Sequence, residues 1–176
     1  MAKSEKSVFF DSTVLINFGE IKAFNLLIDL YPERIVIAEE VRQDIFEESY
    51  RTEKVLKKYL KEGSIDTLTL SSLAELSLYN EYSNKLDPGE AATIVAASRN
   101  NGIVATDDRD ARRIARNKEN LKITGSVGIL LRSVSKNLKT VQEAEGLHSK
   151  MIEKANYFSP INSLKAYIEK RDLDSD

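Results

Sequence analysis

Acidic residues follow two short apolar segments of this 176-residue sequence, at positions where they could hold a metal ion. Asp11 comes directly after residues 7–10, and Asp107 and Asp108 come just after residues 103–105. If both segments are parallel strands of one sheet, their carboxyl ends lie at one edge, where open α/β sheets bind ligands. Clustered carboxylates repel one another unless a cation neutralises them, so the pattern favours metal-assisted phosphodiester hydrolysis.

Further acids lie on helices that could converge on the same edge. Glu90 is in the first turn of the helix that leads into residues 103–105, and Glu40 and Asp44 lie on the helix that leaves the second strand. Each acid alone has a structural explanation, as a helix N-cap, a partner of the helix dipole or part of a solvated face. Their joint occurrence is what points to a hard divalent ion.

Composition restricts the chemistry further. The chain has 26 Lys and Arg, 28 Asp and Glu, one His and no Cys. These counts exclude a disulfide framework, a cysteine nucleophile and a zinc site built on Cys or several His. For His148 we expect a structural role. Oxygen-only ligation suits Mg²⁺ or Mn²⁺ better than zinc.

The elements that must position these acids alternate between short apolar strands and helices, which predicts a mostly parallel sheet covered on both faces. Gly19 is expected to divide residues 14–30 into two helices. The expected strands are residues 7–10, 34–37, 64–70, 103–105 and 121–123, and the other expected helices are 38–48, 51–60, 71–85, 87–98, 108–116, 127–134, 141–155 and 161–171. The fold class is therefore a three-layer α/β/α domain with about five strands. Residues 1–135 should form its main part, and residues 136–176 should be C-terminal helices packed on the same domain.

Five stretches in sequence order resemble the motifs of PIN-domain ribonucleases. They are VFFDSTVLI (residues 8–16), IAEEVRQDI (37–45), LDPGEAA (86–92), VATDDRDAR (104–112) and TGSVGILL (124–131). The last two are similar to a prokaryotic branch of the family with toxin-like members. No single motif is specific, but their order on the expected elements is.

The resemblance implies a set of site residues. Asp11, Glu90 and Asp107 would bind the metal, and Asp44 or Asp108 would orient the attacking water. Thr13 or Thr106 would support the site. The chain departs from the family where Ala38 replaces the usual Pro and Asp44 the usual Glu. Because Asp44 is one methylene shorter, Glu40 is the alternative for the second acid, and Asp107 and Asp108 are alternatives for the last.

Four arginines follow the last acidic pair at helical spacing: Arg109, Arg112, Arg113 and Arg116. They could be a plain solvated helix face. Alternatively, they form a rim that binds nucleic-acid phosphates beside the acids.

The resemblance implies a Mg²⁺- or Mn²⁺-dependent endoribonuclease, with RNA as substrate, that could be the toxin of a type II toxin–antitoxin pair. An antitoxin protein and a second copy of the chain are the other expected partners. A catalytically weak or inactive RNA-binding scaffold is the alternative. A phosphate-binding doubly wound domain is disfavoured because neither glycine-rich phosphate loop occurs. No segment has the roughly 18 consecutive apolar residues of a membrane span, so we expect a cytoplasmic protein.

Overall fold

The fold is a five-stranded, all-parallel sheet with helices on both faces. A computed structural model describes residues 5–173. The strand order is β3-β2-β1-β4-β5, and every neighbouring pair is parallel. The strands are β1 (Val8–Phe10), β2 (Ile35–Ala38), β3 (Ile65–Leu68), β4 (Ile103–Ala105) and β5 (Lys122–Thr124). This confirms the predicted fold class and all five strand positions.

The helices agree closely with the predicted ranges. They are α1 (Ser12–Glu20), α2 (Phe24–Leu30), α3 (Glu39–Glu48), α4 (Tyr50–Lys61), α5 (Leu73–Tyr82), α6 (Pro88–Arg99), α7 (Arg109–Asn117), α8 (Ser126–Ser135), α9 (Val141–Lys154) and α10 (Leu164–Leu173). Among the described residues, no helix combines the length and apolar character needed to cross a membrane.

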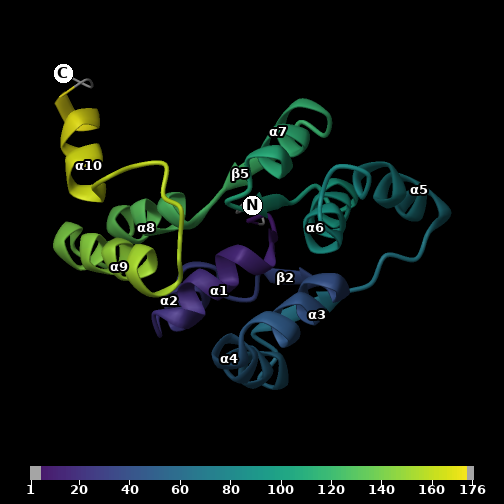
Figure 1. Cartoon of the computed structure of the whole chain (residues 1–176), viewed down its shortest axis with the longest axis horizontal. Helices are drawn as coiled ribbons and strands as arrows, with labels where there is room; N and C mark the ends of the chain where they lie inside the picture. The colour runs from purple at the N-terminus through teal and green to yellow at the C-terminus, as the bar shows by residue number, and fades with distance from the viewer. Residues whose placement is uncertain (1–4, 174–176) are drawn as a thin grey trace.

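The order of the strands explains the two helical layers. The chain moves from β1 outward to β2 and β3, and then returns past β1 to β4 and β5. Because crossovers between parallel strands are right-handed, the helices of the outward and the return path cover opposite faces. Figure 1 shows α1, α2, α8 and α9 side by side, and α5, α6 and α7 in a separate group.

The centre of the core lies between β1 and α6. All three residues of β1 are buried, as expected for a strand covered on both faces. In α6 the run from Ala91 to Ala97 is fully buried, and its small side chains let the helix pack against β1, β2 and β4. This packing places the N-terminus of α6 at the carboxyl edge of the sheet.

The break between α1 and α2 corrects the expectation for Gly19. Gly19 lies inside α1, and the chain turns at Lys22, whose φ is +59°. A Cβ on Gly19 would lie only 2.2 Å from Oγ1 of Thr52 on α4. Glycine is needed here because α4 approaches α1 closely, so its presence does not mark a helix end.

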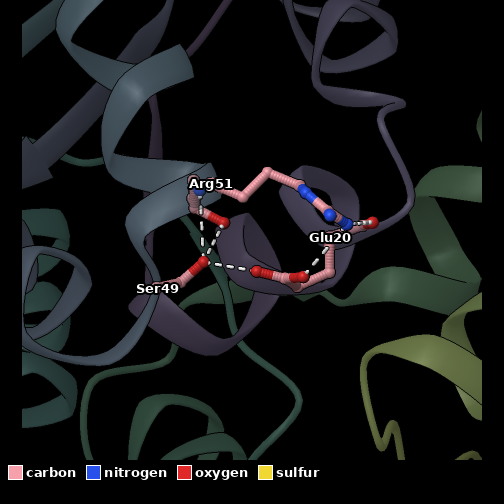
Figure 2. Close-up of polar contacts among 4 residues, drawn as sticks. Glu20, Ser49 and Arg51 are labelled. Atoms are coloured by element: carbon pink, nitrogen blue, oxygen red, sulfur yellow. Dashed lines mark hydrogen bonds and ion pairs between the residues drawn. The ribbon is translucent and has the colours of Figure 1, made fainter.

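Polar contacts next to this glycine fasten the end of α1 to the start of α4. Ser49 Oγ donates to Glu20 Oε1 at 2.5 Å, and Arg51 Nη1 donates to the backbone oxygen of Glu20 at 2.9 Å (Figure 2). The same Ser49 hydroxyl caps α4 by accepting from the backbone N–H of Thr52. Helix α1, which Asp11 caps, is thus held at its far end.

The C-terminal helices extend the layer that contains α1. Helix α9 packs against α8 and α1, and α10 packs against α9. His148 is buried in α9, and its Nε2 lies 2.7 Å from Ser159 Oγ. This environment is what a structural histidine requires.

Candidate active site

The acids that follow β1 and β4 meet where the strand order reverses. β1 pairs with β4 in the register Phe10 to Ala105, and the backbone N–H of Asp11 donates to the Ala105 carbonyl at 2.9 Å. The residues just beyond the two strands therefore lie side by side. A reversal of strand order leaves a crevice at the carboxyl edge, which is the usual ligand position in open α/β sheets.

Asp11 is the most enclosed of these acids, with only 1% of its surface exposed. Its Oδ1 accepts from the backbone N–H of Ser12 at 2.8 Å, and its Oδ2 accepts from the hydroxyls of Thr13 at 2.8 Å and Thr106 at 3.1 Å. Burial nevertheless raises the pKa of Asp11 to about 6, and the charge of Asp107 adds to the rise. The two threonines predicted as supporting residues both contact this carboxylate.

Asp107 is held by donors from two helices. Its Oδ1 accepts from the backbone N–H of Ser126 at 2.8 Å, and its Oδ2 accepts from Ser126 Oγ at 2.5 Å and Asn17 Nδ2 at 3.1 Å. Burial still raises the pKa of Asp107 although these hydrogen bonds and the charge of Arg112 lower it. Its orientation is set before any ligand binds.

Glu90 joins this pair from the first turn of α6. Its Oε2 accepts from the backbone N–H of Asp87 at 3.1 Å, which is a helix-capping contact. Burial, and after it the charges of Asp11 and Asp108, raise the pKa of Glu90 to about 7. Negative charge from β1, β4 and α6 therefore accumulates in one place.

Asp108 serves as the N-cap of α7. Its Oδ1 accepts from the backbone N–H of Ala111 at 2.7 Å, and its own N–H donates to Thr106 Oγ1 at 3.2 Å. Of the two alternatives for the last acid, Asp107 is the one held in the crevice by α1 and α8. Asp108 adds its charge beside Glu90 while it caps the helix.

Asp44 lies against the start of α6. A Cβ on Gly89 would be only 2.2 Å from Asp44 Oδ2, so the glycine before Glu90 makes room for this carboxylate. Burial, and after it the charges of nearby acids such as Glu48 and Asp87, raise the pKa of Asp44 to about 6. One turn earlier, Glu40 Oε2 is buried without a hydrogen-bond partner among the described residues. The structure thus leaves both alternatives for the second acid in place.

The arginines of α7 do not share one environment. Arg112 points inward, and its Nη1 donates to the carbonyls of Thr106 at 2.8 Å and Thr124 at 2.9 Å. Arg113 pairs with Asp110 at 2.8 Å on the surface. Arg109 and Arg116 are exposed. Arg112 therefore joins the ends of β4 and β5. Arg109, Arg113 and Arg116 are the three that face solvent.

Gly125 makes the contact between these groups possible. A Cβ at this position would lie 2.6 Å from Asp107 Oδ1 and 2.9 Å from Arg112 Nη1. Residues 124–126 therefore fit around Asp107. Gly125 leaves space for its carboxylate, and Ser126 donates hydrogen bonds to it.

Three residues contact the site although no role there was predicted for them: Asn17, Ser126 and Tyr157. Asn17 follows Asp11 by six positions on α1, and Ser126 begins α8. The hydroxyl of Tyr157, after α9, lies 3.5 Å from Asp107 Oδ1. A polar residue inside the apolar face of α1 could have indicated Asn17, whereas no pattern marks Tyr157.

The donor set fits a hard divalent cation. Within residues 5–173, no three His, Asp or Glu side chains form a ready-made metal-binding group. Such a cage is not required for Mg²⁺, which keeps several waters and is usually bound through one or two carboxylates together with substrate phosphates. Burial raises the pKa values of Asp11 and Glu90, and Glu40 Oε2 has no hydrogen-bond partner among the described residues, so these carboxylate oxygens have room for a further ligand.

A separate cleft of about 790 Å³ lies at the far end of α1. Its lining includes Lys22, Tyr50, Arg51, Lys54 and Lys58, and none of the predicted site residues. The acids at the carboxyl edge therefore occupy a different part of the molecule.

Comparison with protein families agrees with this architecture. A family model described as a PIN domain matches residues 7–171. The match extends well beyond residues 7–135, where the motifs lie, and includes the C-terminal helices. No curated protein shows a significant match to the chain.

Proposed function

The chain belongs to the PIN-domain family, whose members are generally nucleases that use divalent metal ions, and from that premise we propose that it is a Mg²⁺- or Mn²⁺-dependent endoribonuclease. The observation that carries the proposal is the buried carboxylate of Asp11 at the carboxyl edge of the sheet, between β1 and β4, where the strand order reverses. Beside it, Glu90 and Asp107 are two further acids whose pKa values are raised by burial.

In this proposal Asp11, Glu90 and Asp107 hold the metal, with Thr13 and Thr106 fixing the Asp11 carboxylate. A bound divalent ion supplies an activated water and stabilises the leaving oxygen of the phosphodiester. Asp108 or Asp44 would accept a hydrogen bond from the attacking water and orient it. Ser126 and Asn17 prevent Asp107 from turning away.

The exposed arginines of α7 would bind the RNA strand. Arg109, Arg113 and Arg116 can contact phosphates without reading the bases, which positions the strand beside the acids. Arg112 acts differently in this account, because its hydrogen bonds hold the ends of β4 and β5 and keep positive charge near Asp107.

Cleavage of a panel of single-stranded and structured RNAs tests the activity. The account predicts products in Mg²⁺ or Mn²⁺ and none in EDTA. Cleavage that persists in EDTA would remove the metal from the mechanism.

A catalytically weak RNA-binding scaffold is the second candidate. The specific observation in its favour is Asp44, which is one methylene shorter than the Glu usual at this position of the family and so reaches less far towards a metal. Under this function, the protein binds RNA and Mn²⁺ but leaves every RNA of the panel intact.

We also propose that the chain is a toxin held in check by an antitoxin protein, and that it forms a homodimer. The support for the toxin role is the similarity of the Thr-Gly-Ser-Val-Gly segment to toxin-like relatives. The exposed Leu73 and Leu76 on α5 offer an apolar surface for self-association. Growth arrest on expression, relieved by the product of a neighbouring short reading frame, tests the first proposal, and sedimentation equilibrium tests the second.

A further inference from the structure

The segment between α9 and α10 sends one side chain back into the protein. The chain turns at Asn156, whose φ is +52°, and the backbone N–H of Tyr157 donates to the Met151 carbonyl at 3.2 Å. Tyr157 is only 8% exposed, whereas its neighbour Phe158 is 95% exposed. The turn thus selects a single aromatic residue for burial.

Neighbouring residues hold the Tyr157 ring in place. The ring of His148 meets it edge to face, with centroids 6.4 Å apart. His148 Nε2 is in turn 2.7 Å from Ser159 Oγ, two residues beyond Tyr157. Because Ser159 Oγ also accepts from the backbone N–H of Ile161 at 3.2 Å, the segment closes on itself around the ring.

The phenol of Tyr157 ends between α8 and Asp107. Its hydroxyl faces Asp107 Oδ1 at 3.5 Å, and the backbone N–H of Val127 lowers the pKa of the phenol, which burial raises. Ser126 donates to this same Oδ1. The phenol contact is longer than an ordinary O–H···O hydrogen bond, and such bonds in ligand-free active sites often tighten when the ligand binds.

We propose that Tyr157 is a positioning residue that completes the active site from the C-terminal segment by holding Asp107 Oδ1. With Tyr157, the carboxylate has donors from three separate parts of the chain: α1, the start of α8 and the segment after α9. Groups that hydrogen-bond to a ligating carboxylate fix its direction and so govern metal affinity. The inference rests on the proposed function, in which Asp107 faces the metal.

The test compares Tyr157→Phe, which removes only the hydroxyl, with Phe158→Ala, which alters the exposed neighbour. The dissociation constant of Mn²⁺ is measured by calorimetry, and kcat and KM are measured separately on RNA. Tyr157→Phe should weaken Mn²⁺ binding by about 10-fold and lower kcat more than it raises KM, because Asp107 acts on the metal and not on RNA binding. Phe158→Ala should match the wild type.

A second variant separates positioning from folding. Ser159→Ala keeps the phenol but removes the hydroxyl that contacts His148 and Ile161. It should also weaken Mn²⁺ binding, by less than Tyr157→Phe does. A lower melting temperature of Tyr157→Phe with unchanged Mn²⁺ affinity of the folded protein would make the residue merely structural and overturn the inference. If the wild type binds Mn²⁺ without cleaving RNA, the proposed function fails while the Mn²⁺ comparison still decides this inference. If the wild type binds no Mn²⁺, both fail.

Discussion

Replacing Asp11 with Asn should make the metal-free protein more stable while it destroys the site. The ionised carboxylate is buried, and its pKa rises from 3.8 to about 6. Asn keeps the helix cap, because its oxygen can still accept from the Ser12 N–H. Its amide can donate to the hydroxyls of Thr13 and Thr106, which rotate to accept. The substitution therefore removes a buried charge and leaves the oxygen and the N–H groups of the new amide with hydrogen-bond partners.

The magnitude follows from the pKa. At about 1.4 kcal/mol per pKa unit, the rise to about 6 corresponds to about 3 kcal/mol of destabilisation whenever Asp11 is ionised. A folded-state pKa above the unfolded one means that the native protein binds more protons, so stability falls as the pH rises from about 4 to above 6. Asp11→Asn should gain up to about 3 kcal/mol at pH 8, or roughly 6–12 °C in melting temperature, and little near pH 4.

Urea unfolding of the wild type and Asp11→Asn in EDTA, at both pH values, measures this difference. Asp110→Asn is the matched control, because Asp110 is an exposed acid whose replacement should change stability by less than about 0.5 kcal/mol. If Asp11→Asn is no more stable than the wild type at pH 8, or if its gain in stability is the same at both pH values, burial of a charged Asp11 does not destabilise the protein.

The metal, two glycines and two arginines can each be tested by one measurement. Mn²⁺ at 100 times its Kd should stabilise the wild type at pH 8 by about 2.7 kcal/mol, as measured by thermal unfolding. An equal stabilisation of Asp11→Asn would show that Asp11 does not bind the metal. Gly125→Ala should lower stability and kcat, because its Cβ would lie 2.6 Å from Asp107 Oδ1. Gly146→Ala, in open space on α9, should add roughly 1 kcal/mol to stability in urea, and similar effects of the two substitutions would refute the packing argument. Arg109→Ala and Arg116→Ala should each make the dependence of the RNA-binding constant on salt less steep. The slope of its logarithm against the logarithm of salt concentration should fall in magnitude by about 0.7. Unchanged slopes would show that RNA does not contact these arginines.

The fold was readable from the sequence because each element carries its own signal. Residues 103–105 are a short apolar run that follows Gly102, where a helix was expected to have ended, and precedes polar residues, and they form β4. Pro88 and Glu90 mark the start of α6, where the structure places it. Since carboxyl ends of parallel strands share an edge, the meeting of Asp11 and Asp107 also followed from their order alone.

What escaped prediction depends on contacts between distant segments. Gly19 has the local signal of a helix break, but its reason is Thr52 on α4. Arg112 has the spacing of a solvated face, yet the carbonyls at the ends of β4 and β5 draw it inward. Tyr157 lies 50 residues from Asp107 and outside every motif, so only the packing of α9 on α1 and α8 brings it to the site.

Single-turnover cleavage of an RNA substrate by the wild type, Asp11→Asn and Asp110→Asn in Mn²⁺ tests directly whether Asp11 is the centre of the active site. The wild type and Asp110→Asn should cleave rapidly, and Asp11→Asn should be slower by at least about 100-fold although that variant is folded and more stable. Cleavage by Asp11→Asn at the wild-type rate would contradict the claim that this buried carboxylate is the centre of the active site.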